Sequence, residues 1–355
     1  MIQMFPTPAA TMRNRPVSSL LVSVLTAVCL LLASCSVKEL DTGAADAFDL
    51  LKADQLKQNS PYIPTEGFVD TSAGAYHYVE MGEGPPLLLY HGFPSFWYAW
   101  KNVMPALAPH FRVIAVDGLG ANLSAKPAGL DPYKVEALAG QLIEVLDGLN
   151  VDEPVYLAGH DWGGALVWSF AQAYPERVAA MTAISAPPLN LFLELLETNE
   201  DQRKASAYVE RIKGYLVSAE LPPSAAERMT QFGYGTLLET ELIREADYQA
   251  FGVAMAQPDA LRATGSWYAA NIPEPSSISE SDYWPSRTAS ASVPSLLIWG
   301  EGDTVFVPEF LGMVASYAEP IQVEVLPEAK HWPMFEERDR TNELLLDFFL
   351  GVARR

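Results

Sequence analysis

The chain has 355 residues, a formal net charge of −21 and 49% hydrophobic residues. The hydrophobic content suffices for a full core and excludes a disordered or collagen-like chain, and the acidic balance excludes nucleic-acid binding, which needs a basic face. The only cysteines are Cys29 and Cys35, so the rest of the chain has no disulfide, thiol nucleophile or cysteine metal site. No histidines and acidic residues show metal-ligand spacing, and we expect neither a metal nor another cofactor.

Residues 1–34 are typical of a secretory signal. Arg13 and Arg15 precede an apolar run that ends in Leu-Ala-Ser before Cys35, and a basic region, an apolar region and small residues in this order mark a cleaved signal. The run is near the lower length limit for crossing a bilayer, which leaves an uncleaved anchor helix as one alternative and an ordinary signal as another. Translation can start at Met1 or at Met12.

The end of this signal resembles the bacterial lipobox. That resemblance implies cleavage before Cys35 and lipidation of its thiol, and Ser36 as the next residue favours the outer membrane. We therefore expect an exported protein that touches the membrane only through its N-terminal lipid and faces the periplasm. Residues 35–66 are polar with one short amphipathic piece, and we interpret them as a tether.

From residue 67 the chain alternates between strand and helix patterns. Residues 68–71 and 76–80 alternate in polarity around Ser72-Ala73-Gly74, which predicts a hairpin. Residues 86–90 form an unbroken apolar run, typical of a strand buried in a parallel sheet. The alternation predicts a mostly parallel, doubly wound α/β sheet. Further strands are expected at 111–116, 155–158, 178–184, 295–300 and 322–326, and helices at 96–108, 132–149, 165–171 and 341–352.

The alternation stops after Ala186-Pro187-Pro188 and resumes about a hundred residues later. The intervening segment is helical or irregular. We therefore predict a core formed by residues 67–188 and 291–355, with a helical cap over residues 189–290 inserted between two strands of the sheet.

The segment 159–164, Gly-His-Asp-Trp-Gly-Gly, follows a predicted buried strand and leads into a helix. A strand that reverses into a helix over one residue is strained and needs glycine neighbours. This pattern predicts a nucleophile elbow with Asp161 in the place where an esterase has serine. The start of the following helix keeps such a carboxylate ionised. Taken alone, Asp161 could also be an ordinary helix cap.

Two further polar residues follow predicted strands. Asp303 lies just beyond the strand at 295–300, and His331 lies in the loop after the last strand. The order nucleophile, acid, histidine is that of the α/β-hydrolase fold. His91-Gly92-Phe93-Pro94 lies where this fold has its second oxyanion donor, and we expect the backbone N–H groups of Phe93 and Trp162 to form the oxyanion hole.

An aspartate nucleophile selects the reaction. Its carboxylate attacks a saturated carbon that bears a leaving group and forms an alkyl ester. Water activated by His331, with Asp303 orienting the ring, then attacks the carbonyl carbon of Asp161. The electrophile is therefore expected to be an epoxide or an alkyl halide.

Several motifs together resemble the epoxide hydrolases of the α/β-hydrolase fold over about residues 67–352. These are His91-Gly92-Phe93-Pro94, Trp97-Tyr98-Ala99-Trp100, the segment 117–127 (Asp-Gly-Leu-Gly-Ala-Asn-Leu-Ser-Ala-Lys-Pro) and the elbow. The resemblance implies that two cap tyrosines bind and protonate the epoxide oxygen, and the matching positions are Tyr208 and Tyr268. It also implies a small apolar epoxide and water as partners, and no cofactor.

Two other readings remain open. A haloalkane or haloacid dehalogenase shares the aspartate nucleophile, and the indole of Trp162 could hold a halide, but Phe93 stands where many haloalkane dehalogenases have a donor such as Asn. A fluoroacetate dehalogenase places arginine directly after the nucleophile, where this chain has Trp162. The other alternative is a lipoprotein that uses the fold only as a binding module, against which the intact Asp161, Asp303 and His331 argue.

Overall fold

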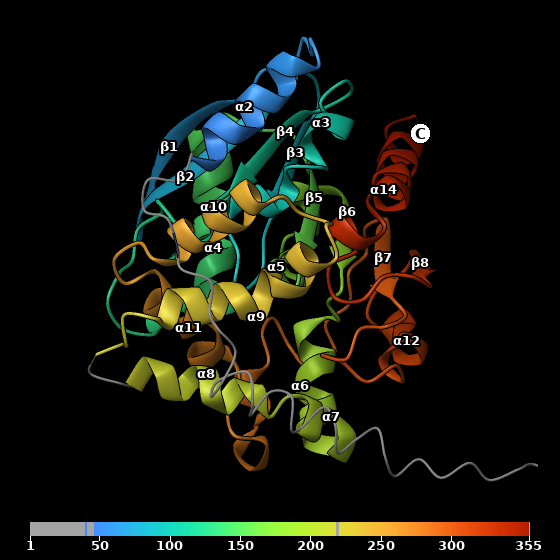
Figure 1. Cartoon of the computed structure of the whole chain (residues 1–355). Helices are drawn as coiled ribbons and strands as arrows, with labels where there is room; N and C mark the ends of the chain where they lie inside the picture. The colour runs from blue at the N-terminus through green and yellow to red at the C-terminus, as the bar shows by residue number, and fades with distance from the viewer. Residues whose placement is uncertain (1–39, 41–45, 218–219, 355) are drawn as a thin grey trace, which may run out of the picture. The chain divides into compact units, whose positions relative to one another are not determined.

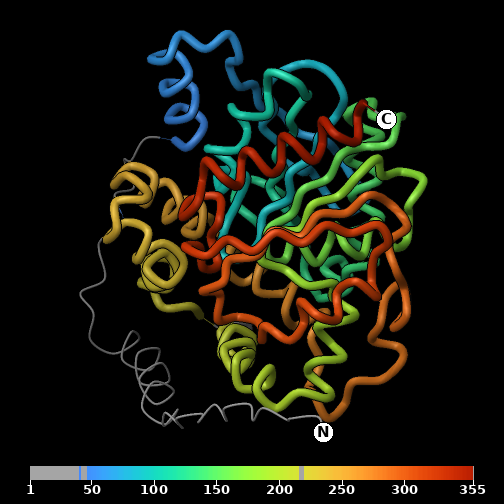
Figure 2. The backbone as a smooth tube through the Cα atoms, turned by 90° about the vertical axis from the view of Figure 1, so that its right-hand side faces the viewer, coloured from blue at the N-terminus to red at the C-terminus, as the bar shows by residue number. Residues whose placement is uncertain are grey.

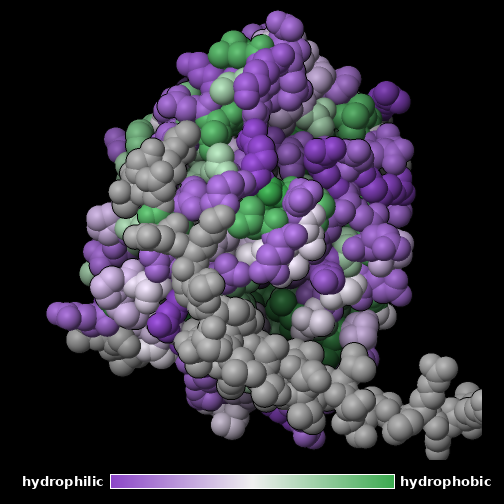
Figure 3. All heavy atoms as spheres, viewed as in Figure 1, coloured by the Kyte–Doolittle hydropathy of each residue, from purple (hydrophilic) through white to green (hydrophobic). Residues whose placement is uncertain are grey.

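The computed structural model describes residues 40, 46–217 and 220–354. The predicted signal and Cys35 lie outside these residues. Within the described part, no helix combines the length and the apolar character needed to cross a bilayer. Hydrophilic residues dominate the coloured part of the face shown in Figure 3, which agrees with the acidic composition.

The described strands form one eight-stranded sheet with the order β1-β2-β4-β3-β5-β6-β7-β8. β1 and β2 form the predicted hairpin, β2 pairs antiparallel with β4, and all neighbours from β4 to β8 are parallel. This topology confirms the predicted α/β-hydrolase fold class. The strands are β1 (Thr65–Thr71), β2 (Gly74–Met81), β3 (Pro86–Tyr90), β4 (Arg112–Val116), β5 (Val155–His160), β6 (Val178–Ile184), β7 (Ser295–Gly300) and β8 (Ile321–Leu326).

Helices cover both faces of this sheet (Figures 1 and 2). In β3, Leu88 and Tyr90 pack with α4 and α5, whereas Leu87 and Leu89 pack with α3 and α14. Successive side chains of a strand point to opposite faces, so a strand covered on both faces is apolar throughout. The helices of this core are α3 (Met104–Leu107), α4 (Val135–Gly148), α5 (Trp162–Ala173), α12 (Phe310–Met313), α13 (Pro333–Glu336) and α14 (Arg338–Ala353).

The segment between β6 and β7 is helical, and it runs from green-yellow to orange in Figure 1. Within it, α8 packs against α11 and α9 against α10. Its helices are α6 (Leu189–Thr198), α7 (Glu200–Ala205), α8 (Tyr208–Val217), α9 (Ala225–Glu239), α10 (Glu245–Met255) and α11 (Ala260–Asn271). Short 3₁₀ helices connect elements throughout: Trp97–Trp100, Asp131–Tyr133, Pro175–Arg177, Pro275–Ser277, Glu280–Asp282 and Val314–Ser316.

The tether prediction is corrected for residues 46–57. They form α2 (Ala47–Lys57), which begins at Asp46, whose carboxylate accepts a hydrogen bond of 2.7 Å from the Phe48 N–H. Ala47 and Leu51 are buried on the core, and α2 contacts α10. A helix with this narrow apolar stripe gains its stability from packing rather than from its own sequence.

A buried ion network joins α2, α10 and the core. The Asp247 side chain is 1% exposed and lies 2.6 Å from Nζ of Lys101, while it accepts hydrogen bonds from the Tyr98 hydroxyl at 2.8 Å and from Nη2 of Arg244 at 2.8 Å. The other side of Arg244 binds both oxygens of Asp54 on α2, at 2.9 and 2.8 Å. These cations and the Arg244 backbone N–H lower the pKa of Asp247 against the opposing effect of burial, so the carboxylate is ionised.

We predict that Asp247→Asn destabilises the protein by about 3–5 kcal/mol, because it leaves the charge of the largely buried Lys101 without its partner. Asp54→Asn is the control, since Arg244 is 46% exposed there and a solvent-exposed pair is worth about 0–1 kcal/mol. The free energy of unfolding is measured by urea denaturation. If the two substitutions lowered the free energy of unfolding equally, Asp247 would not be the main source of the stabilisation.

Candidate active site

Asp161 occupies the turn between β5 and α5 with a positive φ of 51° and a ψ of −120°. The turn is possible because its neighbours lack side chains. A Cβ on Gly159 would lie 2.1 Å from the carbonyl oxygen of Gly163, and a Cβ on Gly163 would lie 2.0 Å from that of Tyr90. The turn therefore has the geometry of a nucleophile elbow, with a buried carboxylate at its apex.

Two backbone N–H groups interact with this carboxylate. The Phe93 N–H donates to Oδ1 of Asp161 at 2.7 Å, and the Trp162 N–H donates to the same carboxylate. A Cβ on Gly92 would lie 2.4 Å from Oδ1, so only glycine permits this approach. The predicted oxyanion donors are thus both directed at the predicted nucleophile.

The loop that carries Phe93 is braced by His91. Its Nδ1 lies 2.8 Å from the carbonyl oxygen of Gly92, and its Nε2 accepts from the Gly118 N–H at 2.8 Å. These contacts require a neutral ring with its hydrogen on Nδ1. Burial lowers the pKa of His91, which favours the same neutral form.

The second oxygen of Asp161 faces the predicted base. Oδ2 lies 3.7 Å from Nε2 of His331, and Nδ1 of His331 lies 2.8 Å from Oδ2 of Asp303. The other oxygen of Asp303 accepts from the Val305 N–H at 2.8 Å, which fixes the carboxylate. Asp303 and His331 follow β7 and β8, so the carboxyl edge of the sheet brings the three residues together.

The charges of these groups depend on one another. Burial raises the pKa of Asp161, against the opposing effects of His331 and the two backbone donors. Burial alone would lower the pKa of His331, but the carboxylates of Asp303 and Asp161 outweigh it and raise this pKa to about 9. The resting site therefore holds an imidazolium between two carboxylates.

His160 is a site residue that the sequence reasoning missed. Its Nε2 lies 2.8 Å from the carbonyl oxygen of His331, and the ring centroids of His160 and Trp332 are 4.5 Å apart. Burial and the neighbouring His331 hold the pKa of His160 well below its ordinary value, so the ring is neutral and its Nε2–H donates. The available signal was its place directly before Asp161 in a buried motif.

Two tyrosines of the helical segment line the same cavity as the predicted nucleophile, Asp161. Tyr208 begins α8 and Tyr268 lies in α11, and their ring centroids are 6.1 Å apart at an interplanar angle of 83°. Tyr268 also packs edge-on against Phe93 and Trp162, at 5.3 and 5.0 Å. Burial raises the pKa of both hydroxyls, and for Tyr208 the negative charge of Asp161 raises it further. Both hydroxyls are therefore protonated and able to donate.

A cavity of about 340 Å³, including the part open to solvent, lies between these groups. Asp161, Trp162, Tyr208 and Tyr268 are its lining residues with polar side-chain atoms, and Leu189, Phe192, Ile272 and Phe306 are among its apolar walls. The structure thus brings together all the predicted site residues that it describes, and Cys35 alone lies outside the described residues.

An aspartate at the elbow of a mostly parallel sheet, paired with a histidine and a second carboxylate, is the arrangement of an α/β-hydrolase. A sequence profile of the alpha/beta hydrolase fold family matches residues 85–338, and the chain belongs to this family.

Known relatives span most of the chain. The AB hydrolase superfamily protein YfhM of Bacillus subtilis is 30% identical over 291 residues, which are 79% of this chain and 96% of that protein. Epoxide hydrolase 4 of Mus musculus is 29% identical over 307 residues, which are 84% of this chain and 83% of the mouse protein. The crystal structure of Bacillus megaterium epoxide hydrolase with an inhibitor is 28% identical, with a TM-score of 0.70 over 80% of this chain and 99% of that one.

The charge coupling in this site predicts the behaviour of an Asp303→Asn variant. Removing the nearest carboxylate should lower the pKa of His331 from about 9 by about 1–3 units. The measurement is an NMR titration of the imidazole protons, and His77, which contacts Asp117 and not Asp303, serves as the internal control. An unchanged His331 titration would show that Asp303 does not set its charge.

Proposed function

We propose that this protein hydrolyses an epoxide to a vicinal diol through a covalent alkyl ester on Asp161. One observation carries the proposal: the two oxygens of this carboxylate have different surroundings. Oδ1 is bound to the Phe93 N–H, whereas Oδ2 faces His331 at 3.7 Å. Two protonated tyrosines lie across the cavity from them. The mouse and B. megaterium relatives carry the name of this activity.

The first step is alkylation. The free oxygen Oδ2 attacks a carbon of the epoxide ring, and the bond between that carbon and the ring oxygen breaks. The oxygen takes a proton from Tyr208 or Tyr268, which leaves an alcohol on the substrate and a phenolate on the enzyme. General acid assistance of this kind contributes about 10²–10⁴-fold to a rate. The apolar walls of the cavity favour an uncharged, apolar substituent on the epoxide.

The second step is hydrolysis of the ester. Alkylation removes the charge of Asp161, which is one of the groups that raise the pKa of His331. His331 therefore loses its proton more readily, and the phenolate is a base that can receive it. Neutral His331 then deprotonates water, which attacks the carbonyl carbon of Asp161. The oxyanion forms on Oδ1, which faces the Phe93 N–H, with the Trp162 N–H as the second donor. The bond between the carbonyl carbon and Oδ2 then breaks, and the hydroxyl that water supplied passes its proton to the departing alkoxide. The diol leaves as the carboxylate is restored.

The surroundings of Trp162 favour this reaction over dehalogenation. A halide site needs donors directed at the leaving atom, and the side chain of Phe93 has none. Trp162 packs edge-on against Tyr268, with ring centroids 5.0 Å apart. The groups directed at the cavity therefore suit a leaving oxygen that needs a proton.

A His331→Gln variant tests the proposed function. Alkylation needs an ionised Asp161 and an acid, so it still occurs in this variant. Ester hydrolysis is blocked, because the base His331 is absent. The variant mixed with a terminal aryl epoxide should stall as an adduct that is heavier by one substrate, and mass spectrometry should place this mass on the peptide containing Asp161. The control Asp161→Asn/His331→Gln should form no adduct. An adduct on any other peptide, or none, would refute the ester mechanism.

We also propose that the mature protein is a lipoprotein of the cell envelope. The basic and apolar segments before Leu-Ala-Ser-Cys35 support this proposal, together with Ser36 for an outer-membrane destination. A lipid on Cys35 would be its membrane attachment, with the enzyme facing the periplasm.

Substitution of Cys35 tests the lipid anchor. Cys35→Ser should move the protein from the membrane fraction to the soluble fraction, because the acceptor thiol is lost. Cys29→Ser is the matched control, since Cys29 lies within the segment that would be removed, and this variant should remain in the membrane fraction. A wild-type protein that is already soluble in the periplasm would contradict the proposal.

A further inference from the structure

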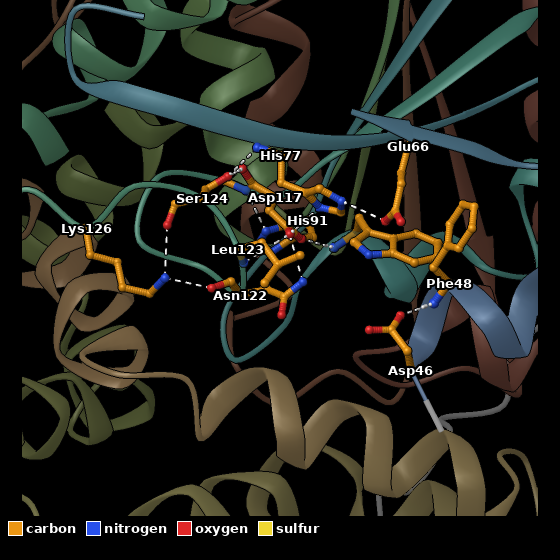
Figure 4. A network of polar contacts seen from close by, with 12 residues as sticks. Asp46, Phe48, Glu66, His77, His91, Asp117, Asn122, Leu123, Ser124 and Lys126 are labelled. Atoms are coloured by element: carbon orange, nitrogen blue, oxygen red, sulfur yellow. Dashed lines mark hydrogen bonds and ion pairs between the residues drawn. The ribbon is translucent and has the colours of Figure 1, made fainter. Parts of the chain in front are cut away.

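We define residues 91–97 as the oxyanion loop. A polar network around Asp117, shown in Figure 4, contacts both ends of this loop. Asp117 follows β4 and has no exposed surface. The Asp117 carboxylate accepts from the Trp97 N–H at 3.0 Å, at the end of the loop. The next residue, Gly118, donates its N–H to His91 at the start of the loop, at 2.8 Å. Two consecutive residues therefore hold both ends of the loop whose third residue, Phe93, binds Asp161.

His77 on β2 is the cationic partner of this carboxylate. Its Nδ1 lies 2.8 Å from Oδ2 of Asp117, and its Nε2 lies 3.2 Å from Oε2 of Glu66 on β1. Ionised carboxylates only accept hydrogen bonds, so both ring nitrogens must carry hydrogen and the ring must be positively charged. Burial lowers the pKa of His77, but Asp117 and Glu66 outweigh it and raise this pKa. The geometry and the electrostatics agree on the charged form.

No other cation in the described part of the chain contacts the Asp117 carboxylate. Lys126 is near, but its Nζ donates to the carbonyl oxygens of Asn122 and Ser124, at 2.6 and 2.9 Å. The remaining donors to the carboxylate are neutral: Asn122 Nδ2 at 2.9 Å and the Leu123 N–H at 3.4 Å. Without the charge of His77, a fully buried carboxylate would have no cation in contact with it, and only the more distant charge of Lys126 would act on it, which is unfavourable.

We propose that His77 is a positioning residue for ester hydrolysis: its charge balances Asp117, and through Asp117 it keeps the Phe93 N–H directed at the oxygen where the oxyanion forms. This inference rests on the proposed function. His77 does not touch the reacting atoms, since it acts through Asp117, Trp97 and the oxyanion loop.

The two half-reactions depend differently on this donor. Alkylation moves negative charge away from Asp161, so a donor at Oδ1 gains nothing as the ester forms. Hydrolysis places a full negative charge on the same oxygen. Complete loss of one oxyanion donor lowers the rate by about 10²–10³-fold. A donor that is displaced but still present lowers the rate by less. Loss of the His77 charge should therefore slow hydrolysis by about 10-fold or more while alkylation changes little.

The test measures the two rates separately in the full-length protein. Single turnover of a terminal aryl epoxide is quenched at intervals, and the ester on the Asp161 peptide is quantified as it forms and disappears. His77→Gln should accumulate ester, because the ratio of hydrolysis to alkylation falls about 10-fold. Loss of folded protein lowers both amplitudes together and leaves this ratio unchanged, so the ratio separates positioning from a general structural role.

Two further variants identify the cause. His77→Gln/Asp117→Asn removes both charges and keeps a side-chain oxygen for the Trp97 N–H, so the ratio should return to within about threefold of wild type. Glu66→Gln removes the contact at the other ring nitrogen. The Glu66 side chain is 43% exposed, and an exposed pair contributes little, so this control should change the ratio less than twofold.

The outcomes separate this inference from the proposed function. A wild type that forms neither ester nor diol with any epoxide overturns the proposed function and this inference with it. A wild type that turns over, with an unchanged ratio in folded His77→Gln, overturns the inference alone. If His77→Gln does not fold, the double variant provides the test. A double variant that folds and has a near wild-type ratio of hydrolysis to alkylation supports the proposal that His77 compensates the charge of Asp117. Failure of the double variant to fold would overturn the inference, because the pair then serves the fold as a whole.

Discussion

The hydrogen bond of 2.7 Å from the Phe93 N–H to Oδ1 of Asp161 is the contact on which the site depends. It joins the ends of β3 and β5, which are adjacent parallel strands, and it requires a glycine at position 92. Because Oδ1 is occupied by this donor, Oδ2 is the attacking oxygen in the proposed mechanism. In that mechanism the same bond selects the attacking atom in the first step and stabilises the charge in the second.

The cap and the core contribute different chemistry to this site. The core supplies groups whose charge is set by close partners, with His331 held between Asp161 and Asp303. The cap supplies Tyr208 and Tyr268, whose burial keeps them protonated. The buried network around Asp247 joins helix α10 to Lys101 and Tyr98 of the core.

The sequence predicted the features that depend on local order. The apolar runs predicted the parallel strands, and the positions of Asp303 and His331 after strands placed both at the carboxyl edge of the sheet. The hydrogen bond from His160 to the carbonyl oxygen of His331 could not be predicted, because no motif pairs a ring nitrogen with a particular backbone carbonyl of a distant loop. The same holds for His77 and Asp117, which meet where β2 pairs with β4.

Two predictions of local structure were wrong, a helix over residues 96–108 and a tether over residues 46–57. The helix expected over 96–108 is a 3₁₀ turn followed by the short α3, which has proline in its first turn. A proline cannot donate within a helix, so it favours a new helix start at this point. Residues 46–57 have a weak helical pattern by themselves, and they fold as α2 because the core and α10 cover their few apolar side chains.

The central claim is that water attacks the carbonyl carbon of Asp161 and not the epoxide. A single turnover of excess wild-type enzyme in water enriched in heavy oxygen tests it directly. After digestion, the Asp161 peptide should carry one heavy oxygen in its carboxylate, while the first diol released contains an oxygen that came from the enzyme. Label found only in the diol, with an unlabelled Asp161 peptide, would contradict the account, because water would then have opened the ring itself.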